Sequence, residues 1–416
     1  MNCPYCGQTN PPGVTVCLSC GKLLLAAPSV PGTGAIVTQY SGLSGNEMYC
    51  AWLLGFRPGK LLVGNSVFSM GVLGGIGSNI RTFMGGEITP YTDMIANGRR
   101  LSLQRFELEL TTSGGSGASG VTSELIFHPG NAEFLTVGST LQRDKTSGQA
   151  FSTSADGQEL FCQWDAGYAP LSFVFGNVAY SIGFGRNLLG SLRRLAKGEV
   201  KQYSNIFNTT RNLALERIIK EAKTKGANSV IGIRTTILPI AASQVQEMVM
   251  IGTASYNPAV VSLAAGVGGV TTSDLTAEET WNIAKLGYAP LKLVLGTSVY
   301  SLGVAGGVKA MFRNLVRGEI KSLTEMIYGA REESLKRVQT QAEEIGADDV
   351  LGIKTYIYNL GDDVIEFLAI GTAVKRLDGV ATHSDQLPPQ AIIRDKDTFV
   401  NLANAAYGSD LQNPTR

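Results

Sequence analysis

The amino-acid sequence predicts an α+β protein in which an N-terminal four-cysteine zinc ribbon precedes three β-α-β-β repeats. Three observations predict this fold: two Cys-x-x-Cys pairs within the first twenty residues, a glycine-centred pattern that occurs three times, and a helical stripe followed by two apolar runs in the repeats. A chain of 416 residues can bury several large cores. Its stability therefore needs no disulfide framework.

Composition excludes some classes of function. Lys and Arg number 35 against 34 Asp and Glu, which gives a net charge of +1. This balance excludes a globally basic nucleic-acid binder, although a local basic patch stays open. The chain contains two histidines, His128 and His383. Catalysis by a histidine base, or a His-rich metal site, would have to depend on one of these two.

The start of the chain has neither a basic n-region nor an apolar h-region, so no secretory signal is expected and we predict a cytoplasmic protein. One uncharged stretch, Leu61–Ile80, has the length of a membrane span. It contains serines, asparagines and several glycines, and it recurs twice further on with charges inserted. We therefore interpret it as a buried strand that runs into a glycine-rich turn, and predict no transmembrane segment.

Four of the six cysteines form the ribbon predicted for residues 1–25. Cys3, Cys6, Cys17 and Cys20 have the spacing of a tetrahedral zinc site. So short a segment buries too little apolar surface to fold alone, and zinc binding supplies about 10–16 kcal/mol in finger peptides. Two disulfides are the alternative, which the missing signal disfavours. We predict one structural Zn²⁺ per chain.

This module resembles the small zinc ribbons at the N-termini of many prokaryotic multidomain proteins. Such ribbons bind proteins or nucleic acids, or have no known ligand. Lys22 is the only basic residue among the first 25. We therefore expect the ribbon to contact an unidentified protein partner rather than nucleic acid.

Self-comparison of the sequence divides the rest of the chain. Gly55, Gly167 and Gly287 each begin a Gly-aromatic-x-Pro motif, at offsets of 112 and 120 residues. The register then holds for nearly fifty residues. We predict repeats at 47–143, 159–257 and 279–377, linkers at 26–46, 144–158 and 258–278, and a polar tail at 378–416. The tail pattern is compatible with a short amphipathic helix over Asp397–Tyr407.

Periodicity predicts the elements of each repeat. Apolar runs at Leu171–Phe175 and Leu291–Leu295 predict a first strand. A glycine-rich segment and a short helix follow, at Leu188–Lys197 in the second repeat and Val308–Arg317 in the third. A stripe from Ile320 to Ile345 predicts the main helix. The two strands that close the third repeat are expected at 350–358 and 364–369.

The motifs of the third copy resemble the YbjQ family: Val294–Thr297, Phe312–Gly318, Ala330–Glu332, Gly346–Asp348 and Gly371–Val374. The family carries a heavy-metal-binding label. The resemblance implies a dodecin-like subunit and, for single-domain members, a homopentameric ring. This chain departs from the pattern at Ser69, Ser181 and Ser301, where an arginine commonly follows the first strand.

Two sets of recurring charges are candidate site residues. Arg81/Glu87, Arg193/Glu199 and Arg313/Glu319 precede the main helix. One interpretation is an anion site at the helix N-terminus. In the interpretation we favour, the Glu complements the helix dipole and the Arg pairs with this Glu or with a neighbouring subunit. We interpret Arg99, Arg211 and Arg331 as interface ion-pair residues rather than catalysts.

The remaining soft ligands do not form a cluster in the repeats. Cys50 and Cys162 occupy equivalent positions without a nearby His or second Cys, so we interpret them as small buried hydrophobes. A heavy-metal site needs clustered Cys, His or Met. The sequence also lacks a Walker A loop, a G-x-S-x-G elbow and an H-E-x-x-H motif. We therefore expect that the three repeats bind no further transition metal and that the protein is not an enzyme.

These expectations favour a non-enzymatic cytoplasmic assembly or scaffold protein. Linkers of fifteen to twenty flexible residues reach about 20–27 Å, enough to step between stacked layers. We therefore predict a homopentamer of roughly 220 kDa, from five 44.1 kDa chains, with three stacked tiers and the ribbons at one end. The alternative is a protein that binds a small ligand or metal in the clefts between repeats.

Overall fold

The fold is taken from a computed structural model of the chain. It describes residues 8–9, 19, 40–69, 86–143, 149–181, 198–240, 245–301, 321–361, 364–387 and 399–401. The predicted zinc ligands, Cys3, Cys6, Cys17 and Cys20, lie outside the described residues, as do the short helices expected at 188–197 and 308–317. No helix in the described part is long and apolar enough to cross a membrane.

Three successive units have the same order of elements: short helix, strand, long helix and two-stranded hairpin. Unit 1 contains α1 (Gly45–Leu53), β1 (Arg57–Ser69), α3 (Thr89–Thr112), β3 (Gly117–His128) and β4 (Asn131–Gln142). Unit 2 contains α4 (Gly157–Asp165), β6 (Ala169–Ser181), α6 (Lys201–Thr224), β8 (Ser229–Pro239) and β9 (Val245–Tyr256). Unit 3 contains α8 (Ala277–Lys285), β11 (Tyr288–Ser301), α10 (Lys321–Glu344), β12 (Asp349–Gly361) and β13 (Val364–Arg376). The predicted α+β class is confirmed.

The short first helix of each unit was not predicted. Each helix begins with a capping box, in which a Ser, Asp or Thr side chain and a Glu three residues later bond each other's backbone N–H. These boxes pair Ser44 with Glu47, Asp156 with Glu159, and Thr276 with Glu279. That spacing was a signal for a helix start in the sequence.

The first strand of each unit is longer than its apolar run. β6 continues to Ser181 because its partner β9 extends beside it as far as Val245. In every unit the first strand pairs antiparallel with the last, and the last pairs antiparallel with the one before it. The long helix packs against this sheet.

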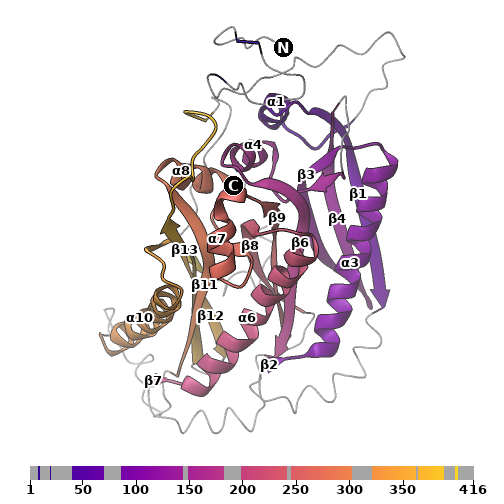
Figure 1. Cartoon of the computed structure of the whole chain (residues 1–416). Coiled ribbons are helices and arrows are strands. Elements are labelled where there is room, and N and C mark those ends of the chain that lie inside the picture. The colour runs from indigo at the N-terminus through magenta and orange to yellow at the C-terminus, as the bar shows by residue number, and fades with distance from the viewer. Residues whose placement is uncertain are drawn as a thin grey trace.

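Neighbouring units share strands and lie side by side, in chain order (Figure 1). β2 (Gly86–Glu87) comes from unit 1 and joins β6 of unit 2. β7 (Gly198–Glu199) comes from unit 2 and joins β11 of unit 3. In the opposite direction, β5 (Phe151–Ser152) runs parallel to β3, and β10 (Thr271–Thr272) runs parallel to β8.

The two linkers predicted between units, 144–158 and 258–278, are therefore wrong as flexible spacers where the structure describes them. Residues 258–278 form the 3-10 turn η1 (Pro258–Val260), helix α7 (Val261–Gly266) and β10. Val260 and Thr271 are fully buried. The described part of 144–158 holds β5, which is hydrogen-bonded to unit 1. Backbone that is paired and buried cannot act as a free tether.

The three-tier arrangement is also wrong. It assigned each unit of one chain to a different ring, whereas units 1, 2 and 3 contact one another laterally. One hydrophobic cluster even runs from Val174 and Ile218 in unit 2 to Leu295 and Leu368 in unit 3. Covalent linkage allows one chain to make the lateral contacts itself, because each neighbour is held at high effective concentration.

The region after unit 3 is packed where the structure describes it. Leu377, Val380 and Leu387 contact the cluster formed by the short helices. Residues 399–401 form strand β14, which runs parallel to β12 at Thr355–Ile357. The helix predicted over 397–407 is thus wrong for these three residues, because they pair as a strand with the edge of β12. The other residues of that range lie outside the described part.

Candidate functional site: the interfaces between units

The contact between units 1 and 2 is centred on a buried ion pair. Arg99 of α3 meets Glu247 of β9, and both side chains are almost completely buried. Two guanidinium nitrogens donate to the two carboxylate oxygens, Nη2 at 2.8 Å and Nε at 3.2 Å. Nη1 donates to the backbone and hydroxyl oxygens of Ser123 at 3.1 Å. This bidentate geometry gives the buried pair a fixed orientation.

The same pair recurs between units 2 and 3. Arg211 of α6 donates to Glu366 of β13, with Nη2 to Oε2 at 3.0 Å. Its other bonds go to Thr297 and Tyr180. The guanidinium also lies 5.7 Å from the Tyr180 ring centre and 5.4 Å from that of Tyr358. The interpretation of Arg99 and Arg211 as interface residues is confirmed.

A second, partly exposed ion pair lies at each interface. Glu87 of β2 accepts from Arg217 of α6 at 2.7 Å, and Glu199 of β7 accepts from Arg337 of α10 at 2.5 Å. These two glutamates belong to the Arg-x5-Glu pattern, in which we expected the Glu to complement the helix dipole and to pair at most with the Arg of its own motif. Each instead accepts from an arginine on the long helix of the next unit. Arg81, Arg193, Arg313 and Glu319 lie outside the described residues.

Sequence reasoning missed the carboxylate partners Glu247 and Glu366. A signal was available, because a Glu precedes the apolar start of the last strand in all three units, at Glu133, Glu247 and Glu366. Three arginines and three glutamates that recur in register indicate three copies of one interface. Only the spatial order of the units reveals which Arg meets which Glu.

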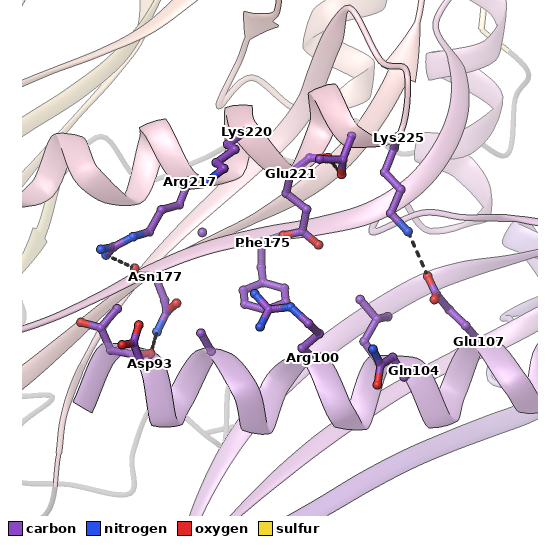
Figure 2. A pocket seen from close by; sticks show the side chains of 15 residues that line it. Asp93, Arg100, Gln104, Glu107, Phe175, Asn177, Arg217, Lys220, Glu221 and Lys225 are labelled. Carbon is purple, nitrogen blue, oxygen red and sulfur yellow. Dashed lines mark hydrogen bonds and ion pairs between the residues drawn. The ribbon is translucent and has the colours of Figure 1, made fainter. Parts of the chain in front are cut away.

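A cleft of about 480 Å³ opens between α3 and α6, with β6 as its floor (Figure 2). Figure 2 shows Arg217 reaching Asn177 of β6, and Lys225 reaching Glu107 on the opposite helix. The lining carries four cations and three carboxylates: Arg100, Arg217, Lys220, Lys225, Asp93, Glu107 and Glu221. The nearly balanced charge is compatible with a small polar ligand.

Glu221 is the group of this cleft whose pKa the surroundings raise. Burial raises its pKa from 4.5 to about 7, although the backbone N–H of Phe175 and the charges of Arg100 and Lys225 oppose the shift. The Phe175 N–H donates to Glu221 at 3.2 Å. In unit 3 the equivalent Gln341 accepts the Leu295 N–H at 3.3 Å and donates to the Leu295 carbonyl at 2.7 Å. A neutral side chain thus fills the same role of bonding the strand backbone.

The described residues do not offer a heavy-metal site. They contain no group of three or more His, Cys, Asp or Glu side chains that could hold an ion. Cys50 and Cys162 are fully buried, and burial raises the pKa of both thiols, that of Cys50 to about 11. Since thiolate is the metal-binding form, both behave as the small hydrophobes that the sequence predicted.

The two histidines make polar contacts at the surface. His128 bonds the carboxylate of Glu133 at 2.8 Å, and this bond lowers the pKa of Glu133. The backbone N–H of His383 donates to the carbonyl of Asp165 at 2.9 Å. His128 and Glu133 are a pair, and no third His, Cys, Asp or Glu of the described residues completes a metal-binding group with them.

This fold and these interfaces define a class of protein: α+β units of the YbjQ type that associate laterally. A family described as "Putative heavy-metal-binding" matches residues 168–257 and 279–376, which are units 2 and 3. A UPF0145 protein of Pseudothermotoga lettingae is 40% identical over 85 residues, or 20% of this chain and 80% of that protein. The chain belongs to the UPF0145 family.

Two further relatives are similar to this chain. A UPF0145 protein of Pyrococcus horikoshii is 40% identical over 79 residues, covering 19% of this chain and 68% of that protein. An encapsulin nanocompartment protein of Mycobacterium tuberculosis is 27% identical over 233 residues. That match covers 55% of this chain and 87% of the relative, so it is longer than a single unit.

Proposed function

We propose that this chain is a non-enzymatic assembly or scaffold protein built from three YbjQ-like units. The observation that carries the proposal is the buried Arg–Glu interface, which the chain forms twice between its own units. Removing one partner of such a pair is strongly destabilising, so these contacts fix which surfaces meet. The similarity to an encapsulin nanocompartment protein supports a role in a larger assembly.

Self-association is the direct test of this function. Light scattering of the full chain between about 1 and 50 µM is expected to give a mass above the 44.1 kDa of one copy. The dependence of mass on concentration distinguishes a stable assembly from a weak one. A mass of one chain throughout this range, at low and at physiological salt, would contradict self-assembly.

The N-terminal ribbon is the proposed contact for a protein partner. Cys3, Cys6, Cys17 and Cys20 would hold one structural zinc, a soft ion suited to four thiolates. Elemental analysis is expected to find one zinc per chain. The double variant Cys17→Ser with Cys20→Ser should lose it, while circular dichroism of the three units stays unchanged. Equal zinc in both proteins would contradict the ribbon.

The cleft between α3 and α6 supports a second candidate function, binding of a small anion. Arg100 and Lys220 line it from opposite helices. Titration calorimetry with inorganic phosphate and small carboxylates tests this function. Binding that is lost in Arg100→Ala and in Lys220→Ala would support it, whereas no heat with any of these anions would reject it.

A further inference from the structure

Each interface between units joins two different surfaces. One is the helix face, the first half of a unit's long helix. The other is the strand face, made of the next unit's first strand and the Glu of its last strand. α3 covers the strand face of unit 2, and α6 covers that of unit 3. Two surfaces of the same kinds remain at the ends of the row: the strand face of unit 1 on β1, and the helix face of unit 3 on α10 (Figure 1).

The strand face of unit 1 has the chemistry of a covered surface. Val63 and Val67 of β1 are 49% and 59% exposed. At the equivalent positions of unit 2, Phe175 and Ala179 are 3% and 0% exposed under α3. Leu295 is likewise buried in unit 3. Apolar residues are thus exposed at a strand position that the other two units bury.

The helix face of unit 3 is the matching surface. In α3 the buried hydroxyl of Thr92 accepts the N–H of Ala179 at 2.9 Å. In α6 the buried hydroxyl of Ser204 accepts the N–H of Val299 at the same distance. The equivalent residue of α10 is Thr324, and it is exposed. One turn later Tyr328 is 60% exposed, an unusual position for a large aromatic side chain.

The charges of the two free surfaces are complementary. Arg331 of α10 stands where α3 has Arg99 and α6 has Arg211. Glu133 of β4 stands where the other units have Glu247 and Glu366, and at present its carboxylate bonds the exposed His128. The third Arg and the third Glu of the series therefore lie at opposite ends of the row of units.

A backbone seam supplies an independent observation. Thr153, just before α4, donates its N–H to the Ala118 carbonyl, and its own carbonyl accepts the N–H of Val121. Ser273 makes the same two bonds to Val230 and Ile233 in unit 2. The residue of unit 1 equivalent to Thr153 and Ser273 is Ser41, four residues ahead of α1. The β12 positions equivalent to Val230 and Ile233 are Val350 and Ile353.

The seam of unit 3 is more open than the other two. Val230 and Ile233 are buried beneath the segment that precedes α8, whereas Val350 and Ile353 are only partly buried. Ser41 lies in the described segment that leads into α1, at the far end of the row. The two sides of a further seam, the Ser41 segment and β12, therefore lie at opposite ends of the row. Glu133 and Arg331 are separated in the same way.

We infer that a second copy of this chain docks head-to-tail. The strand face of unit 1 of the second copy packs on the helix face of unit 3 of the first copy. The inference rests on the proposed self-assembly and names its interface. Arg331 pairs with Glu133 of the next copy, Tyr328 covers the exposed valines, and the Ser41 segment pairs with β12. Each chain contributes three units, so a closed ring holds a multiple of three units rather than five. The smallest such ring has two chains, about 88 kDa from the 44.1 kDa chain.

Charge reversal with complementation tests this interface. Glu133→Arg sets two cations against each other at the junction, and Arg331→Glu sets two anions against each other. Each variant alone is expected to lose at least tenfold in association. An equimolar mixture should recover assembly, because a ring of one copy of each has one native junction and one reversed junction. Light scattering measures mass, and circular dichroism confirms that each variant is folded.

Glu124→Lys is the matched control. Glu124 is an exposed residue of β3 in the same hairpin as Glu133. Its equivalent in unit 2, Thr236, is exposed although units 1 and 3 flank unit 2, so this position lies outside the interface. The control should assemble as the unaltered chain does. If the unaltered chain assembles and both reversals retain its mass, or their mixture stays dissociated, the head-to-tail junction is wrong while self-assembly stands. A monomeric unaltered chain would instead overturn the proposed function.

Discussion

At the scale of single residues, the chain buries oppositely charged side chains in pairs between its units. Arg99 and Glu247 are both at most 1% exposed, and each depends on the other for compensation. The sequence indicated the arginine through its recurrence, but the packing of two units determined its partner.

Removal of one partner is expected to cost more than removal of both. Arg99→Ala should lower the free energy of unfolding by about 3–5 kcal/mol, because it leaves Glu247 charged and buried. The double variant Arg99→Met with Glu247→Leu should cost much less. Urea denaturation measures both values. A loss below about 1 kcal/mol for the single variant would show that water reaches this pair.

Glu221 should make stability depend on pH. Its pKa is raised to about 7 from 4.5, so the folded state binds more protons than the unfolded state between these values. Stability contributed by the protonated form is present below pH 4.5 and is lost as pH rises to 7. Glu221→Gln should therefore stabilise the chain at pH 8 and leave it nearly unchanged at pH 4.5.

The size of this effect is limited by partial exposure of Glu221. The full shift would correspond to about 3 kcal/mol at 1.36 kcal/mol per pH unit, and solvent screening reduces it to about 1 kcal/mol. Thermal melts across the pH range measure it. Gln341→Glu, at the equivalent position of unit 3, should have the opposite sign. Parallel pH profiles for the variant and the unaltered chain would contradict this role of Glu221.

At the scale of elements, a close approach of strand and helix explains a glycine that recurs in all units. A Cβ at Gly176 would lie 2.1 Å from the carbonyl oxygen of Ala214 and 2.5 Å from the backbone nitrogen of Ile218. Gly64 and Gly296 make similar approaches to Ser102 and Ser334. Only glycine allows the long helix to lie this close to the first strand.

Gly176→Ala is expected to destabilise unit 2 by about 1–3 kcal/mol or more, because the clash is with backbone atoms that cannot rotate away. Gly45→Ala is the control, since a Cβ at Gly45 meets no atom within 4 Å. Denaturant titration compares the two. Equal stability of both variants would show that α6 can shift away from β6 without cost.

At the scale of the whole molecule, units 2 and 3 share a core, so they should lose structure together. Leu295 belongs to the cluster that spans both units, whereas Val338 belongs to a cluster within unit 3. Leu295→Ala is expected to speed hydrogen exchange in α6 as well as in β11.

Val338→Ala is the control for this coupling. It should speed exchange in α10 and β13 of unit 3, and it should change exchange in unit 2 much less. Exchange followed by mass spectrometry resolves these elements. If Leu295→Ala affected unit 3 alone, the shared cluster would not couple the two units.

The sequence by itself indicated the class of fold and the interface arginines Arg99 and Arg211, because these depend on local patterns that recur in register. The recurring glycines predicted the register of the units, and the isolation of Cys50 and Cys162 predicted their burial. The short helices were missed although their capping boxes are local signals.

Only the tertiary structure decided the arrangement of the units. Sequence composition made 258–278 resemble a flexible linker, yet small and hydroxyl side chains such as Thr271 also suit a buried seam. The carboxylate that meets Arg99 is 148 residues further along the chain. No periodicity links residues that distant, since their contact depends on the order in which whole units pack. Lateral packing within one chain, rather than stacked tiers, follows from that order.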